Sequence, residues 1–209
     1  MKKPYLKKLG KAGNFTVYEV DGDWIRCNKD IEFTNYASHS IKKYVPKYEI
    51  WLDVETSPDE EFFFVNRLLV EELARKHGVT DNKSYYIADD LDRSIRKFQG
   101  LTKKDVYIKV IGHRDGYVIW LVNGNAVRSV YDRTFTQGAH HLAKAYVPKY
   151  PKQVWIDNDL SEKEWPDVID HEFTELIDMR DNGTKYDLAH RRASAKELKD
   201  RRNGSVIDA

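Results

Sequence analysis

The chain has 209 residues, enough for one large domain or two small ones with a buried core. Lysine plus arginine (35) nearly cancel aspartate plus glutamate (34), so the formal charge of +1 does not indicate a nucleic-acid or other polyanionic partner. One cysteine, Cys27, excludes an internal disulfide, and no apolar run approaches the roughly 18 residues of a membrane span. The lysine-rich start lacks the apolar segment of a signal sequence, so we expect a cytoplasmic protein without a membrane partner.

The first half of the chain recurs in the second half. The sequence Val-Asp-Gly-Asp at 20–23 is matched by Val-Asn-Gly-Asn at 122–125, an offset of 102 residues. At the same offset, Tyr-Val-Pro-Lys-Tyr at 44–48 recurs unchanged at 146–150. Two copies are too few for a solenoid, so the repeat predicts two similar units packed about a pseudo-twofold axis.

The predicted elements follow the same order in both copies. Aromatic and β-branched residues surround Asp21-Gly22 and Asn123-Gly124, a pattern typical of a hairpin whose two-residue turn needs positive φ. A polar segment with a proline follows, then a short strand and two helices, the first of which ends at glycine. Ser161 and Glu164 have the form of a capping box. The expected ranges are 15–20 with 24–26 and 117–122 with 126–131 for the hairpins, 50–53 and 154–157 for the later strands, 59–77 and 162–181 for the first helices, and 84–98 and 185–202 for the second helices.

This order predicts the fold class and the division of the chain. We expect an α+β protein of two duplicated units, each a small antiparallel sheet followed by a helix pair. The first repeat unit, 1–99, is expected to be a degenerate scaffold, and the second, 100–209, to carry a functional site. Residues 99–105 form the expected joint, and the ends, 1–13 and 203–209, are expected to be loose.

The sequence His-Glu-Phe-Thr-Glu, which begins at His171, lies in the first helix of the second unit. His171 and Glu175 are four residues apart, so their side chains share one helix face and can reach one cation. Glu172 is turned by about 100° and stands at the edge of that face. His190 lies on the following helix, where it can supply a third ligand. The apolar residues expected on the core side of the helix are Ile169, Phe173, Leu176 and Ile177.

The first copy is an internal control for this motif. Glu175 has a counterpart of the same type, Glu71, but the other three residues do not. With Glu175 aligned with Glu71, His171 falls opposite Arg67 and Glu172 opposite Leu68. When Ala189 is placed on Ala88, His190 falls opposite Asp89. A histidine needed only for packing this helix pair would be expected in both copies, so the difference favours a site in the second copy.

These residues resemble the core of the minimal zincin metallopeptidases, over 154–197, about a fifth of the chain. In that family two histidines four residues apart bind zinc, the glutamate after the first is the general base for a zinc-bound water, and a downstream residue is the third ligand. The resemblance implies that His171 and His190 are ligands and that Glu172 is the base. Glu175 stands where the family has its second histidine, and a set of two histidines and one carboxylate also suits Fe²⁺ or Mn²⁺.

We therefore expect a metal-dependent hydrolase that acts on peptide or amide bonds, with zinc as the leading metal and a peptide or protein as substrate. His140, opposite Ser38, is a candidate substrate contact, because a histidine in a loop can donate a proton to an oxyanion. His141 matches His39 in the copy that lacks the site, which favours a structural role.

The alternative is a non-catalytic interaction protein, in which the duplicated aromatic-rich units form a partner surface. The site-like residues would then form a polar network between the two helices. In that network Glu175 would pair with Arg191 or Arg192.

Overall fold

The computed structural model describes residues 2–204, which form two compact units. The first unit comprises the residues up to Trp24 together with Phe33–Leu101, and the second comprises Ile25–Glu32 and the chain from Thr102 onward. The division at 101–102 falls inside the expected joint. The segment Ile25–Glu32, however, belongs with the second unit although its sequence lies in the first repeat.

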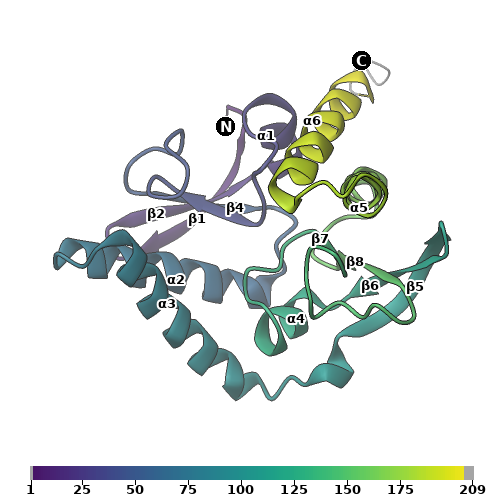
Figure 1. The fold of residues 1–209 in the computed structure, drawn as a ribbon. Coiled ribbons are helices and arrows are strands. Elements are labelled where there is room, and N and C mark those ends of the chain that lie inside the picture. The colour runs from purple at the N-terminus through teal and green to yellow at the C-terminus, as the bar shows by residue number, and fades with distance from the viewer. Residues whose placement is uncertain (1, 205–209) are drawn as a thin grey trace. The chain divides into compact units, whose positions relative to one another are not determined.

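Each unit contains a four-stranded sheet and a pair of long helices (Figure 1). In the first unit α2 lies against the sheet and α3 packs beside α2 (Figure 1). In the second unit α5 packs on β7 and β8, and α6 packs against α5. The elements encoded by the first repeat are β1 (Tyr5–Ala12), β2 (Phe15–Val20), α1 (Gly22–Asn28), β3 (Tyr36–Ser38), β4 (Glu49–Asp53), α2 (Pro58–Lys76), α3 (Asp81–Arg96) and the 3₁₀ turn η1 (Lys97–Gln99). The second repeat encodes η2 (Lys103–Asp105), β5 (Tyr107–Arg114), β6 (Tyr117–Val122), α4 (Gly124–Val130), β7 (Gly138–His140), β8 (Gln153–Asp157), α5 (Trp165–Asn182) and α6 (Tyr186–Gly204).

The duplication and the α+β class are confirmed by the sheets. The strand orders are β1-β2-β4-β3 and β5-β6-β8-β7, so each strand has the same neighbours in both units. The registers also agree, since Val17 pairs with Ile50 as Ile119 pairs with Val154. Both β1 and β5 carry register shifts at equivalent places. The two repeats therefore encode one topology.

The sheets are mixed, whereas purely antiparallel sheets were expected. β2 runs parallel to β4 and β6 runs parallel to β8, and the other pairs are antiparallel. Parallel neighbours need a crossover connection, and the helix and the short strand between β2 and β4 supply it. Strand polarity follows from this connection, which the local sequence pattern does not reveal.

The expected hairpins at Asp21-Gly22 and Asn123-Gly124 are wrong, because a seven-residue helix begins at each glycine. The side chains of Asp21 and Asn123 accept hydrogen bonds from backbone N–H groups three residues later, as helix N-caps do. The glycines are needed for space and not for positive φ: a Cβ at Gly22 would overlap the Asp53 carboxylate, and the equivalent overlap occurs in the second repeat.

The hairpins of this fold join β1 to β2 and β5 to β6 instead. The second turn contains Asp115 and Gly116, with φ of 51° and 77°. The N-terminal segment expected to be loose therefore contains a strand, Tyr5–Ala12. At the other end, α6 continues to Gly204, and the rest of the expected loose end lies outside the described residues.

The long helices lie close to their expected ranges, and α5 begins directly after the residues of the expected capping box. α5 begins at Trp165, and the side chain of its N-cap residue, Glu164, makes no capping hydrogen bond. Glu164 instead forms ion pairs with Arg26 and Arg201 (3.1 and 2.8 Å). A buried carboxylate next to two guanidinium groups is better stabilised there than at an exposed helix end.

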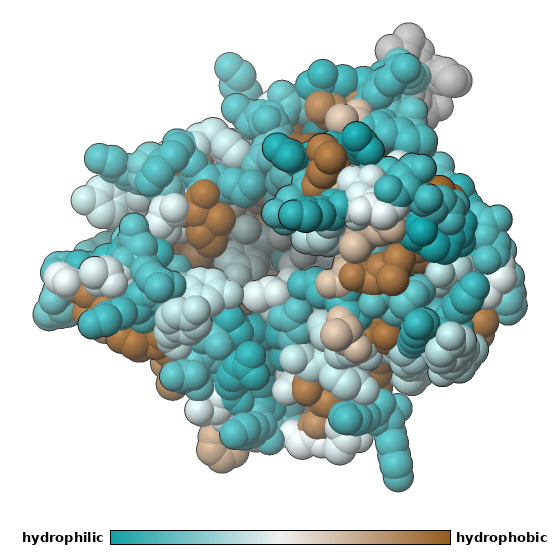
Figure 2. Space-filling view, in the orientation of Figure 1, coloured by the Kyte–Doolittle hydropathy of each residue, from teal (hydrophilic) through white to brown (hydrophobic). Residues whose placement is uncertain are grey.

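The core of the second unit lies between its sheet and α5. Val154 and Ile156 of β8 are fully buried, and so are Phe173 and Leu176 of α5. The apolar face of α5 is therefore the predicted one, and its polar face is turned toward α6. Figure 2 shows that the visible surface is largely hydrophilic with scattered apolar patches. No helix within residues 2–204 combines the length and apolar character needed to cross a lipid bilayer.

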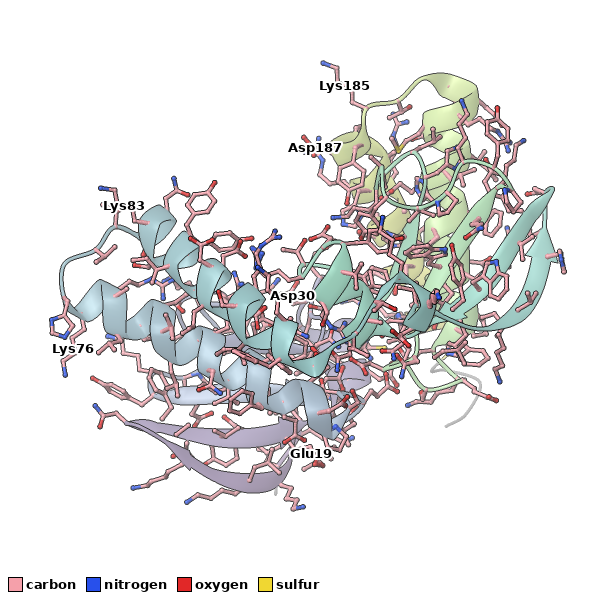
Figure 3. The ribbon with its side chains drawn as sticks, turned by 90° about the horizontal axis from the view of Figure 1, so that it is seen from below. Glu19, Asp30, Lys76, Lys83, Lys185 and Asp187 are labelled. Atoms are coloured by element: carbon pink, nitrogen blue, oxygen red, sulfur yellow. The ribbon has the colours of Figure 1, made fainter. Side chains whose placement is uncertain are left out.

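The connections between the paired helices are exposed. Lys76 and Lys83 flank the α2–α3 connection, and Lys185 and Asp187 stand at the beginning of α6 (Figure 3). The charged side chains labelled at these ends point away from the helix pairs (Figure 3).

Candidate metal centre

The helix pair α5–α6 brings His171, Glu175 and His190 together. The α6 residues Ala189 and Ala193 are fully buried, and their small side chains let the two helices approach closely. His171 and Glu175 lie one turn apart on α5, and His190 faces them from α6. The three residues selected from the sequence thus form one cluster.

Three ligand atoms of this cluster form a small triangle. His190 Nδ1 lies 3.2 Å from His171 Nε2 and 2.8 Å from Glu175 Oε2, and the third side is 4.0 Å. A point equidistant from these atoms lies about 2.0 Å from each. Zinc binds histidine nitrogen and carboxylate oxygen at about 2.0–2.2 Å. The triangle therefore has the size of a metal site.

Hydrogen bonds select which nitrogen of each histidine faces the triangle. His171 donates its Nδ1–H to Glu197 Oε2 (2.8 Å), since a carboxylate only accepts. His190 donates its Nε2–H to Glu32 Oε2 (3.1 Å) for the same reason. When neutral, the two rings therefore direct their lone pairs, on Nε2 of His171 and Nδ1 of His190, into the triangle.

Glu175 is held in a similar way by His140. His140 Nε2 lies 2.8 Å from Glu175 Oε1, and its Nδ1 accepts the Ala143 N–H (3.3 Å). Because Nδ1 is an acceptor, the proton of neutral His140 is on Nε2 and is donated to Glu175. Burial raises the pKa of Glu175, but the hydrogen bonds from His140 and His190 outweigh it and lower the pKa to about 2.

His140 does not fit the expected role of substrate contact. Its side chain is 0% exposed, and both ring nitrogens are hydrogen-bonded inside the unit. A group so enclosed cannot touch a substrate without breaking those bonds. His140 acts on Glu175. Its neighbour His141 stacks on Tyr117, with ring centroids 5.7 Å apart, which is the packing role expected for it.

His140, Glu172 and Glu175 form a second group with the spacing of metal ligands. The tautomer argues against an ion there. The proton on His140 Nε2 occupies the position from which that ring would bind a metal, and Nδ1 already accepts from Ala143. The arrangement therefore favours one ion in the triangle of His171, Glu175 and His190.

When His190 is charged, the proton on its Nδ1 points into the triangle, where a metal ion would lie. Hydrogen bonds to Glu175 and Glu32 raise the pKa of His190 to about 10, so the ring carries a positive charge at neutral pH. Burial opposes the charge on His171, but the hydrogen bond to Glu197 and the charge of Glu172 raise its pKa above the ordinary value. Metal binding at this triangle must displace a proton.

Glu172 differs from the other carboxylates of the cluster. It is buried, and none of the hydrogen bonds or ion pairs formed within residues 2–204 involves its carboxylate. Burial is the largest cause of its raised pKa. Its position depends on Gly138 of β7, because a Cβ at that residue would lie 2.7 Å from Glu172 Oε1. A carboxylate without a partner at the edge of the triangle is available to accept a proton.

The first repeat shows how the same fold looks without this cluster. Tyr36 of β3 takes the place of Gly138, and its ring stacks on Phe64 with centroids 4.4 Å apart. Leu68 takes the place of Glu172, so a tyrosine and a leucine fill the space of a glycine and a glutamate. Packing of a tyrosine ring in one unit thus takes the place of a close approach between a glycine and a carboxylate in the other.

Ion pairs in the two helix pairs correct the alignment of His190. Arg96 contacts Glu60 and Asp92 (2.8 and 3.0 Å) in the first unit. Arg201 contacts Glu164 and Glu197 (both 2.8 Å) in the second. Matching these networks shifts the α6 alignment by four residues, so that His190 falls opposite Tyr85 and no longer opposite Asp89.

The contacts of Arg67 support this alignment. The Arg67 guanidinium lies 4.6 Å from the centre of the Tyr85 ring, as the rings of His171 and His190 lie 4.9 Å apart. Arg67 Nε is also 3.3 Å from Glu71, the counterpart of Glu175. A fixed cation therefore accompanies this glutamate in the first repeat, where the second repeat presents two histidines.

Two carboxylates that contact the histidines of the cluster were not predicted from the sequence, and one expected pairing is wrong. The only sequence signal for Glu197 is its position, four residues before Arg201 and seven after His190 on the same helix. In the structure it contacts Arg201 at 2.8 Å. Glu32 gives no local signal. The expected pairing of Glu175 with arginine is not found among the described residues, since Arg192 contacts Asp178 (2.9 Å) and Arg191 bonds the Asp187 carbonyl.

Comparison with known proteins adds no assignment. No protein-family model, curated protein or solved structure matches this chain. The interpretation of the cluster therefore rests on its own geometry.

Proposed function

We propose that the chain is a metal-dependent hydrolase that binds one divalent cation at His171, Glu175 and His190. The observation that carries the proposal is the second layer of hydrogen bonds. Each ligand residue uses its other polar atom for a partner, Glu197, His140 or Glu32, and the ligand atoms are left facing one another. Such outer partners are typical of protein metal sites.

Zinc fits the donor set best. Two imidazole nitrogens and one carboxylate oxygen are common zinc ligands in catalytic sites, where a fourth position is open to water or substrate. The same set of two histidines and one carboxylate also suits Fe²⁺ and Mn²⁺. The single cysteine, Cys27, is compatible with a reducing compartment, and we place the protein in the cytoplasm.

Glu172 is proposed as the general base. Its carboxylate has no hydrogen-bond partner among the described residues, and burial raises its pKa, so it holds an accepted proton more tightly than an exposed glutamate does. It is positioned beside the triangle and over Gly138, where it can accept a proton from a water molecule that attacks the substrate. A bound cation would polarise the substrate carbonyl and that water. The resemblance to zincins makes a peptide or amide bond the leading substrate.

The test combines metal analysis with two substitutions. Protein purified without an affinity tag should contain one zinc per chain by elemental analysis. Glu172→Gln should keep the metal and the melting temperature, whereas hydrolysis of a casein or mixed-peptide substrate should fall by about 10²–10⁴-fold. His171→Ala should lose the metal as well. Unchanged turnover or loss of zinc in Glu172→Gln would show that its assigned role is wrong.

A structural network is the competing interpretation. His190 joins α5 to α6 through its ion pair with Glu175 (2.8 Å), so the cluster can stabilise the helix pair as a set of ion pairs. This non-catalytic interpretation would be favoured if the chain takes up no zinc and if its melting temperature does not rise with added zinc.

A further inference from the structure

The segment Ile25–Glu32 comes from the first repeat in sequence but is part of the second unit. Its last residue, Glu32, is the carboxylate that accepts the Nε2–H of His190. Its Cys27 carbonyl accepts a hydrogen bond from Arg202 of α6 (3.0 Å). Contacts at both ends of α6 therefore tie this segment to the helix that carries His190.

Arg26 connects the same segment to the other histidine. Its guanidinium contacts Glu164 (3.1 Å), and the side chains are 0% and 3% exposed. Glu164 also contacts Arg201, which holds Glu197 (both 2.8 Å). Glu197 is the acceptor for Nδ1–H of His171. A chain of buried, alternating charges thus runs from Arg26 to His171.

The equivalent segment of the second repeat contacts residues of that repeat. Arg128, the counterpart of Arg26, pairs with Asp157 and Asp159 (2.6 and 2.8 Å) of its own repeat. Thr134 is the counterpart of Glu32, and its hydroxyl bonds Asp132 (2.6 Å). Only the first repeat therefore has a carboxylate at this position, although the first repeat lacks the histidine cluster.

We infer that the first repeat completes the metal site of the second, with Glu32 as a positioning residue that fixes His190 with Nδ1 toward the ion. This inference rests on the proposed metal site. It assigns a task to the degenerate repeat beyond that of a scaffold: residues 25–32 supply the outer carboxylate of one ligand and an anchor for the partner of another. The functional unit is therefore larger than the second repeat.

The experiment measures zinc affinity of the full chain by competition with a chelating dye. Glu32→Ala should weaken zinc binding by about 10–100-fold, as is usual for loss of an outer partner, and Glu32→Asp should recover part of it. Glu162→Ala is the matched control, because Glu162 is an exposed glutamate of the same unit. Its affinity should equal that of the wild type, and all variants should keep the wild-type melting temperature without metal.

Imidazole ¹⁵N spectra of the zinc-bound protein separate positioning from general destabilisation. Wild type and Glu32→Asp should show zinc on Nδ1 of His190 and a slowly exchanging Nε2–H. Glu32→Ala should lose the protected Nε2–H signal. Equal zinc affinity in wild type and Glu32→Ala would overturn this inference alone. A wild-type chain that binds no zinc would overturn the proposed function, and this inference with it.

Discussion

The pH dependence of zinc binding tests the His190 assignment most directly. Only the neutral ring can bind a cation through Nδ1, and hydrogen bonds to Glu175 and Glu32 raise the pKa of His190 to about 10. Below that pH the bound proton competes with zinc. Affinity should therefore rise with pH, by about tenfold per unit between pH 7 and 8.5 if one proton is displaced.

The structure also sets the size of the effect. A pKa about three units above pH 7 implies a penalty of about 10³-fold relative to a fully neutral ring. The His190 side chain is 31% exposed, and solvent screens part of its interaction with the carboxylates. We therefore expect zinc affinity at pH 7 to be about 10²- to 10³-fold lower than it would be for a fully neutral His190 ring. The raised pKa of His171 adds a second proton at lower pH and makes the dependence steeper there.

Calorimetric titration with zinc in buffers of different ionisation enthalpy counts the protons released. One proton per zinc is expected at pH 8, with one zinc bound per chain. Zinc affinity that is constant from pH 7 to 8.5, or binding without proton release, would refute the reasoning. Two zinc ions per chain would refute the tautomer assigned to His140.

Two further predictions concern the packing around the site and the stability of the first unit. Gly138→Ala places a Cβ against the Glu172 carboxylate, so turnover should fall at least tenfold while the zinc content persists. Gly112→Ala is the control, because the nearest atom to its added Cβ is 3.5 Å away, and its turnover should be unchanged. Arg96→Ala removes the guanidinium that pairs with the buried carboxylates of Glu60 and Asp92 and should destabilise the protein by about 3–5 kcal/mol in urea denaturation. Arg93→Ala, with a side chain 56% exposed, should cost less than about 1 kcal/mol, and equal losses in both variants would contradict the burial argument.

The sequence alone determined the features that depend on local spacing. The duplication at a constant offset predicted two units of one topology, and the sheets confirm it. The long helices α2, α3, α5 and α6 could be located from apolar periodicity and their ends from glycine and acidic residues. The shared face of His171 and Glu175 follows from helix geometry, because residues four apart are neighbours whatever the helix packs against.

Tertiary structure decided the features that depend on distant contacts. Asp21-Gly22 has the composition of a turn, but its carboxylate caps a helix and its glycine makes room for Asp53. Strand polarity depended on the crossover between β2 and β4. The alignment of His190 became visible only through the ion pairs of Arg96 and Arg201.

The outer partners of the site illustrate the same limit most clearly. His140, 35 residues from Glu175 in sequence, and Glu32, 158 residues from His190, reach them only through packing of strands, helices and a segment of the other repeat. The local sequence around a glutamate in a polar loop is the same whether its carboxylate faces solvent or a histidine. The sequence therefore sets which residues can bind a cation, and the tertiary structure sets which atoms of those residues face it, because each tautomer is selected by a partner from a distant part of the chain.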